Sequence, residues 1–303
     1  MTGVGPDRAA GASPPGAVSR RELLRRAAAV GLAGPLATAL AACGAESTGG
    51  GSARATTRIV TIGDWGTGSS AAREVAARVR RVALRQRAQL LLTVGDNDYA
   101  DSPKRFEDHW RRDYGWVRPA GIQVAGVLGN HDVETRNGTY EFRTLGMPGR
   151  FYQRRVGSVD LIVLDSNDVD RSQTRWLERA LAAATSRWKI AAFHHPVHTC
   201  GRYEGHHFHS SEWVGLFERY GVQLVLNGHD HNYQRFENGP VTYVVVGGGG
   251  ASLYGLEDCP TSGAAALAGE AVHGFLYLEA DQKRIAGRAI AADGRVIDRF
   301  TVI

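Results

Sequence analysis

Five short polar segments of the chain each follow an apolar, β-branched run and carry side chains that bind metal ions. In chain order they read GDWG, GDNDY, GNHD, HHP and GHDH. A single aspartate, asparagine or histidine after a strand is usually a capping or turn residue. Five such segments in one chain indicate a shared metal site instead. Its candidate ligands are Asp64, Asp96, Tyr99, Asn130, His194, His229 and His231.

The mixture of donors predicts the kind of metal site. Hard oxygens and imidazoles without a thiolate suit two adjacent divalent or trivalent ions, bridged by one carboxylate, better than a closed structural zinc site. Two ions a few ångströms apart clamp a phosphoryl group and activate a water between them. Because side chains repeat every two residues along an extended segment, His229 and His231 point to the same side and can each reach one ion.

The elements that must position these side chains alternate between strand and helix. Apolar runs at 57–62, 88–94, 122–128, 188–193 and 222–226 predict buried strands that end at the five polar segments. Helical periodicity at 69–88, 102–115, 172–184 and 210–221 separates them, and several of these segments open with a serine suited to an N-cap. In such α/β folds a ligand lies at the carboxyl ends of the strands.

The C-terminal part has a different rhythm. Runs at 240–250, 273–281, 284–293 and 295–303 predict consecutive strands, and the last three are joined by short turns without a helix. They suggest an antiparallel sheet packed beside the first. We therefore expect one α/β domain over residues 58–303, built of two packed mixed β-sheets flanked by helices.

The first 57 residues predict an export signal and a tether. Arg20 and Arg21 precede a short apolar run, 27–42, whose length is marginal for a permanent membrane span. The pair resembles a twin-arginine signal, and LAAC, ending at Cys43, resembles a bacterial lipobox. These resemblances imply a signal peptide at 1–42, a lipid on Cys43 that anchors the protein to the outside of the cell membrane, and a flexible tether at 43–57.

Removal of the signal changes the charge of the chain. Residues 44–303 together with Cys43 keep 31 of the 36 basic and 29 of the 31 acidic residues, so the formal net charge falls from +5 to +2. No run of clustered Lys and Arg argues for a nucleic-acid partner, and none is expected. The arginines of RVRRVALRQR indicate the solvated face of a helix.

Two cysteines remain besides Cys43. In an oxidising compartment Cys200 and Cys259 can form a disulfide, and two separate thiols are the alternative, since sequence does not set the distance between them.

The five ordered segments resemble the motifs of the calcineurin-like metallophosphoesterases, and Tyr99, three residues after Asp96, resembles the purple acid phosphatase branch. The resemblance spans about Arg58 to Tyr233. It implies a four-layer sandwich fold and an iron(III) site formed by Asp64, Asp96, Tyr99 and His231. It also implies a second site for iron, zinc or manganese, formed by Asp96, Asn130, His194 and His229, with Asp96 as the bridge. Many phosphodiesterases of the wider superfamily have a histidine where this chain has Gly66, which cannot bind metal.

The same resemblance implies hydrolysis of phosphomonoesters, of the acid phosphatase type, through attack by a metal-bound hydroxide. His131 matches the family's phosphate-contacting histidine and proton donor, and Asp132 either orients its ring or closes a turn. His206 and His207, and also His198, are candidates for substrate contact. His195 adjoins His194 and must point elsewhere if His194 is the ligand. Two alternatives are a phosphodiesterase or nucleotide hydrolase on the same metals, and a non-catalytic lipoprotein that binds metal or phosphate.

Overall fold

The computed structural model describes residues 56–303 except 101, 135, 204–210 and 257–265. The predicted signal at 1–42, Cys43 and nearly all of the tether at 43–57 lie outside these residues and stay predictions. Within the described part, no helix has the length and apolar character needed to cross a membrane.

The elements follow the predicted alternation. The strands are β1 (Thr57–Ile62), β2 (Leu90–Thr93), β3 (Gln123–Ala125), β4 (Tyr152–Val156), β5 (Val159–Val163), β6 (Trp188–Ala192), β7 (Leu224–Asn227), β8 (Tyr233–Asn238), β9 (Val241–Val246), β10 (Ala268–Glu270), β11 (Gly274–Ala280), β12 (Ile285–Ala291) and β13 (Val296–Val302). The helices are α1 (Ser70–Gln86), α2 (Pro103–Tyr114), α3 (Asn130–Glu134), α4 (Thr139–Glu141), α5 (Arg171–Ala183) and α6 (Ser211–Tyr220). All four helices predicted from periodicity are present.

Local capping sets where the helices begin. The Ser69 side chain accepts a hydrogen bond from the backbone N–H of Ala72, and Ser102 does the same for Arg105, so α1 and α2 start at the predicted serines. Helix α5 differs, because Asp170 rather than a serine caps it, through a bond from the Gln173 N–H.

The described strands form two mixed sheets. One has six strands in the order β13-β12-β11-β1-β2-β3, and the other has seven in the order β10-β8-β9-β7-β6-β5-β4. Strands β1, β2 and β3 are parallel, as are β5, β6, β7 and β9. The predicted class of two packed mixed sheets with flanking helices is confirmed. One detail was wrong: β11–β13 do not form a separate antiparallel sheet, because β11 pairs antiparallel with β1 and extends the first sheet.

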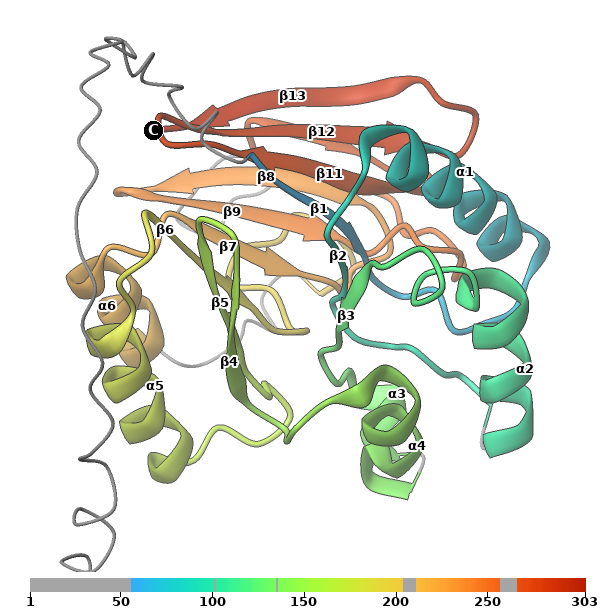
Figure 1. The fold of residues 1–303 in the computed structure, drawn as a ribbon, viewed down its shortest axis with the longest axis horizontal. Coiled ribbons are helices and arrows are strands. Elements are labelled where there is room, and N and C mark those ends of the chain that lie inside the picture. The colour runs from blue at the N-terminus through green and yellow to red at the C-terminus, as the bar shows by residue number, and fades with distance from the viewer. Residues whose placement is uncertain (1–55, 101, 135, 204–210, 257–265) are drawn as a thin grey trace, which may run out of the picture. The chain divides into compact units, whose positions relative to one another are not determined.

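The two sheets face each other, with helices outside (Figure 1). Alternate residues of β6 and of the position after it show the layers. Trp188 and Ile190 belong to the core that contains the first sheet, whereas Ala191 and Phe193 pack with α5 and α6. Helices α1 and α2 pack on the first sheet through residues such as Val75 and Phe106. Burial on both faces explains why these strands read as continuous apolar runs.

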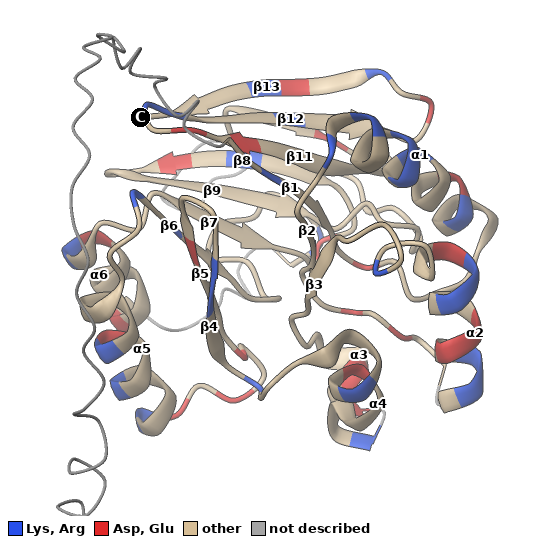
Figure 2. Cartoon of the chain, viewed as in Figure 1, with Lys and Arg blue, Asp and Glu red and all other residues tan. Residues whose placement is uncertain are grey.

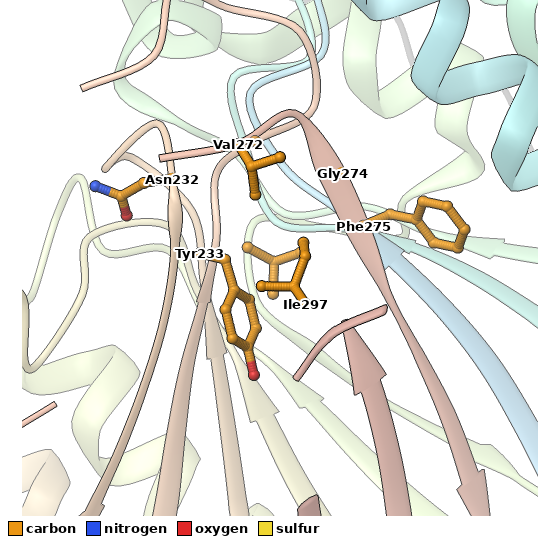
Figure 3. A pocket seen from close by; sticks show the side chains of 8 residues that line it. Asn232, Tyr233, Val272, Gly274, Phe275 and Ile297 are labelled. Carbon is orange, nitrogen blue, oxygen red and sulfur yellow. The ribbon is translucent and has the colours of Figure 1, made fainter. Parts of the chain in front are cut away.

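A small cavity lies between the sheets, near the start of β8 and β11. Figure 3 shows Tyr233, Val272, Phe275 and Ile297 around it. None of the predicted metal ligands lines this cavity, so it belongs to the packing of the sheets.

Candidate metal centre

The predicted ligands lie where parallel strands of both sheets end. Asp64 follows β1, Asp96 follows β2 and His229 follows β7. All three have left-handed backbone, with φ of 58°, 50° and 70°. That conformation costs a non-glycine residue of order 1–3 kcal/mol and persists only where the surroundings enforce it. Strain at three predicted ligands therefore marks these turns as built for their side chains.

Glycines beside the ligands leave the space that the ligands need. A Cβ on Gly95, which has φ of +97°, would lie 2.2 Å from Nδ1 of His194. A Cβ on Gly129 would lie 2.1 Å from Oδ1 of Asp96. The glycines of these two polar segments are thus required by the close approach of a predicted ligand from another strand.

One group of donors gathers around His231. Its Nε2 lies 3.4 Å from Oδ1 of Asp64 and 3.1 Å from the hydroxyl of Tyr99. Its Nδ1 lies 2.8 Å from the carbonyl oxygen of Ser252. A carbonyl only accepts, so Nδ1 carries the hydrogen, and the lone pair of Nε2 points at the carboxylate. Metal-binding histidines are oriented in this way.

A second group gathers around His194. Its Nδ1 donates to the carbonyl of Val94 at 2.9 Å, which again leaves Nε2 with a lone pair. That Nε2 lies 3.2 Å from Oδ1 of Asn130 and 3.2 Å from Nδ1 of His229. Nδ1 of His229 is itself 3.0 Å from the same oxygen of Asn130. Three donors therefore converge on one point.

Asp96 lies between the two groups. Its Oδ1 is 3.3 Å from Nε2 of His194, and donor atoms of Asp64, Asp96 and His194 all lie within 4.8 Å of one another. Burial raises the pKa of Asp96, against the charge of His131 and a hydrogen bond from Tyr99. Since one carboxylate touches both groups, the residues fit two cations that share it.

Electrostatics also favours cations here. Burial, with repulsion from Asp96, raises the pKa of Asp64 to about 7 even though His231 opposes the shift. Burial and the neighbouring His195 hold the pKa of His194 well below its usual value. Buried carboxylates thus lack compensating positive charge while His194 stays neutral, and bound metal ions would supply that charge.

The sequence of this site matches a known family. A profile of the calcineurin-like phosphoesterases matches residues 57–233. The chain belongs to the calcineurin-like phosphoesterase family. Tartrate-resistant acid phosphatase type 5 of Oryctolagus cuniculus is 29% identical over 64% of this chain and 73% of its own length. The Homo sapiens protein of the same name is 26% identical over 78% of this chain and 88% of its own length. Purple acid phosphatase 17 of Arabidopsis thaliana is 23% identical over 65% of this chain and 69% of its own length. The family match and these relatives together show that the chain is a metal-dependent phosphoesterase.

Solved structures share the fold. Purple acid phosphatase PPD1 of yellow lupin superposes with a TM-score of 0.70 at 19% identity, over 82% of this chain and 54% of its own. GAP50, the anchor in the inner membrane complex of Plasmodium, has the same TM-score at 17% identity, over 82% of this chain and 88% of its own. The two-sheet sandwich is thus the fold of this phosphoesterase family.

His131 lies at the open side of the metal centre of this phosphoesterase. Its ring centroid is 4.5 Å from that of Tyr99, and its side chain is 42% exposed. Its Nδ1 is 3.5 Å from Oε2 of Glu134, an exposed carboxylate. His131 is therefore placed to meet a substrate that enters from solvent.

Asp132 does not orient His131. Its buried carboxylate accepts hydrogen bonds from the backbone N–H of Asn97, Asp98 and Gly129 at 2.7–2.9 Å, and from the Asn97 side chain at 2.8 Å. The alternative of a turn role is the one that these contacts support. Burial and the charges of Asp96 and Glu141 raise its pKa well above the usual value. Asp132 is a positioning residue that ties the Asn130 segment to the Asp96 segment.

The histidines after His194 have separate places. Nδ1 of His195 bonds Oγ of Ser166 at 2.8 Å, and the ring of His195 packs beside the predicted ligand His229, with centroids 4.5 Å apart. His198, predicted to contact substrate, is buried instead, with its ring 4.8 Å from that of Tyr243 and its Nε2 bonded to Asn238 at 3.2 Å. That prediction was wrong, because the chain turns His198 into the packing of β8 and β9. His206 and His207 lie outside the described residues.

Cys200 is disulfide-bonded. Cys259 lies outside the described residues, so its pairing with Cys200 stays a prediction.

Two tyrosines stack on the predicted histidine ligands, and neither of them was identified from the sequence. Tyr203 stacks on His229, with ring centroids 4.0 Å apart, and Tyr254 stacks on His231 at 4.2 Å. Asp230, between the two histidines, accepts bonds from Thr199 and from the Arg202 backbone, and so holds the segment that carries Tyr203. The spacing of two residues between His229 and His231 was a signal for this role: if both histidines face the metals, Asp230 between them must face the other way.

Proposed function

We propose that the protein is an exported, lipid-anchored phosphatase with two metal ions that hydrolyses phosphomonoesters, of the acid phosphatase type. The observation that carries the proposal is the convergence of seven oxygen and nitrogen donors in two groups that share Asp96. The acid phosphatase relatives support the choice of a monoester as substrate.

The donor set suggests which ion each group holds. Asp64, Asp96, Tyr99 and His231 would hold iron(III), for which a phenolate oxygen is a suitable hard ligand. Asp96, Asn130, His194 and His229 would hold iron, zinc or manganese. When bound, two such ions neutralise charge on the phosphoryl group and lower the pKa of a water between them.

The side chains of the protein supply the rest of the chemistry. His131 would donate a proton to the leaving alkoxide, since it lies beside Tyr99 at the exposed edge of the site. Asp132 would keep Asn130 and Asp96 in register through its bonds to both segments. Tyr203 and Tyr254 would fix the ring planes of His229 and His231 by stacking.

A substrate comparison tests the proposal. Purified, metal-analysed protein is assayed with para-nitrophenyl phosphate and with bis(para-nitrophenyl) phosphate across pH. The proposal expects two metal ions and faster turnover of the monoester. Faster turnover of the diester would favour a phosphodiesterase or nucleotide hydrolase, and two tightly bound ions without turnover would favour a metal-binding lipoprotein.

Export and anchoring need their own test. Replacing Arg20 and Arg21 by lysine should retain the protein in the cytoplasm if the twin-arginine route is used. Cys43→Ser should release exported protein from the membrane fraction. A normal distribution of both variants would contradict this part of the proposal and leave the phosphatase part intact.

A further inference from the structure

A groove lined by arginines lies between α1 and the strands β12 and β13. Arg78, Arg81 and Arg85 come from α1, and Arg288 comes from β12. Figure 2 shows the Lys and Arg colour along α1, where it lies beside these strands. The sequence did not reveal this cluster, because Arg288 is about 200 residues away along the chain.

Positive charge in this groove is not balanced locally. No carboxylate belongs to its lining, and in the described part of the chain neither Arg81 nor Arg85 has an acidic partner. Arg78 bonds the carbonyls of Ala292 and Asp293 at 3.0 and 2.6 Å, which fixes its position without neutralising it. Arg288 directly faces Arg299 across the β12–β13 ladder. Glu279 lines an adjoining depression together with these two arginines, and the guanidinium carbon of Arg288 lies 4.8 Å from the ring centroid of Tyr277.

The floor of the groove is apolar. Val82 from α1, Ile290 from β12 and Val296 from β13 lie between the arginines. A cationic rim over an apolar floor suits a ligand with both an anionic group and hydrocarbon next to it. Phospholipids with anionic head groups present that combination over a whole surface.

The entry point of the chain agrees with a lipid surface. β1 begins at Thr57, opposite Ala280, next to the β11–β12 turn that carries Lys283 and Arg284. The N–H of Gln89, just after α1, donates to the carbonyl of Arg58 at 2.9 Å, so the last turn of α1 lies at the same end. A tether of the predicted span 43–57 reaches up to about 50 Å when extended. The other part of the groove, at Gly294 in the β12–β13 turn, lies toward the end of β1 that leads to the metal centre.

We propose that the arginine groove, defined by Arg78, Arg81, Arg85 and Arg288, docks the protein on an anionic phospholipid surface. The inference needs no metal and no phosphatase activity. Its failure would therefore leave the proposed function untouched.

The test uses the full chain with Cys43→Ser, so that no lipid anchor contributes. Binding is measured by flotation with phosphatidylcholine vesicles that contain about 30% phosphatidylglycerol, at two ionic strengths. The variant is R81Q/R85Q. Its matched control is R175Q/R179Q, which removes the same charge from exposed positions of α5 on the other sheet. Hydrogen–deuterium exchange of α1 with and without vesicles locates the contact.

R81Q/R85Q should weaken binding roughly tenfold or more, the control should change it less than about twofold, and vesicles should slow exchange in α1. Equal losses in both variants would mean that only net charge matters and would overturn the proposal. Three other results would also overturn the proposal. They are unchanged exchange in α1 with vesicles, vesicle binding that inorganic phosphate abolishes at matched ionic strength, and binding to duplex DNA that is as tight as binding to vesicles.

Discussion

Nε2 of His231 and Oδ1 of Asp64 face each other at 3.4 Å, while Nδ1 of His231 is committed to the carbonyl of Ser252. Burial alone would lower the pKa of His231, but the hydrogen bond to Asp64 and its charge raise it. A proton between the two atoms would therefore either charge the buried ring of His231 or neutralise the carboxylate of Asp64. A metal ion between them satisfies both lone pairs.

Removing this contact should remove the metal. His231→Ala is expected to lose one ion per chain and at least about 100-fold in kcat/KM, because loss of a direct ligand exceeds the effect of losing a supporting residue. Elemental analysis and kinetics measure both. His131→Ala is the matched variant: it should keep two ions and lose activity. If His231→Ala kept two ions, the ligand assignment would be wrong.

Tyr99 should give the protein its colour. A phenolate bound to iron(III) absorbs visible light, and the Tyr99 hydroxyl lies 3.1 Å from Nε2 of His231 within the first group. Tyr99→Phe should abolish the visible band while activity persists. The absorption spectrum of protein with known iron content checks this. A band that survives in Tyr99→Phe would place the chromophore elsewhere.

The fold, and the meeting of the candidate ligands at one place, could be predicted because both depend on short-range patterns. Asp64, Asp96 and His194 follow apolar runs directly, and strand ends in an α/β fold meet at one edge. The pairing of β11 with β1 depends on contacts over 200 residues apart, and no local pattern encodes it.

The role of a residue was harder to predict than its place. Asp132 and His131 are adjacent, yet the carboxylate bonds the segment around Asn97, about 35 residues earlier. His198 has the same side chain and lies on the same connection as the candidate substrate histidines, and its packing on Tyr243 is set only when the chain folds. Such roles follow from where a side chain points after folding.

Asp132→Asn tests the positioning role. The side-chain NH₂ group of the new asparagine must face backbone N–H donors, which lowers the free energy of unfolding by about 1–3 kcal/mol. Because the two segments are then held less firmly, metal binding should weaken about 10- to 100-fold. The pH profile of kcat/KM at saturating metal should keep its shape, because Asp132 does not touch His131. Glu134→Gln, which changes the exposed neighbour of His131, is the control. A displaced pH limb in Asp132→Asn alone would restore the orienting role.

Gly95→Ala should prevent assembly of the second group. The added Cβ would lie 2.2 Å from the His194 ring, on backbone that already has φ of +97°. Gly121→Ala is a matched control, with φ of +75° and nothing within 4 Å of its Cβ. The control should lose only about 1 kcal/mol of stability, whereas Gly95→Ala should also lose metal and activity. Equal behaviour of the two would show that the strain, and not the contact with His194, matters.

The pair Arg235–Asp298 should make stability depend on acid. Nε of Arg235 lies 2.7 Å from Oδ2 of Asp298, and Tyr233 donates to the same oxygen at 2.8 Å. Burial opposes ionisation, but these bonds win and lower the pKa of Asp298. A lowered pKa gives stability that is present above the unfolded value of about 3.9 and is lost as pH falls through the folded value.

Asp298→Asn should therefore lower the free energy of unfolding by about 2 kcal/mol at neutral pH, and the difference from the wild type should shrink below about pH 4. Urea unfolding at several pH values measures it, and the metal-site carboxylates cancel because both proteins contain them. Asp108→Asn, which breaks the exposed pair with Lys104, should leave the unfolding free energy unchanged within error, since solvent screens that pair. A difference for Asp298→Asn that stayed constant down to pH 2 would mean that packing, and not the charge of Asp298, stabilises this contact between the sheets.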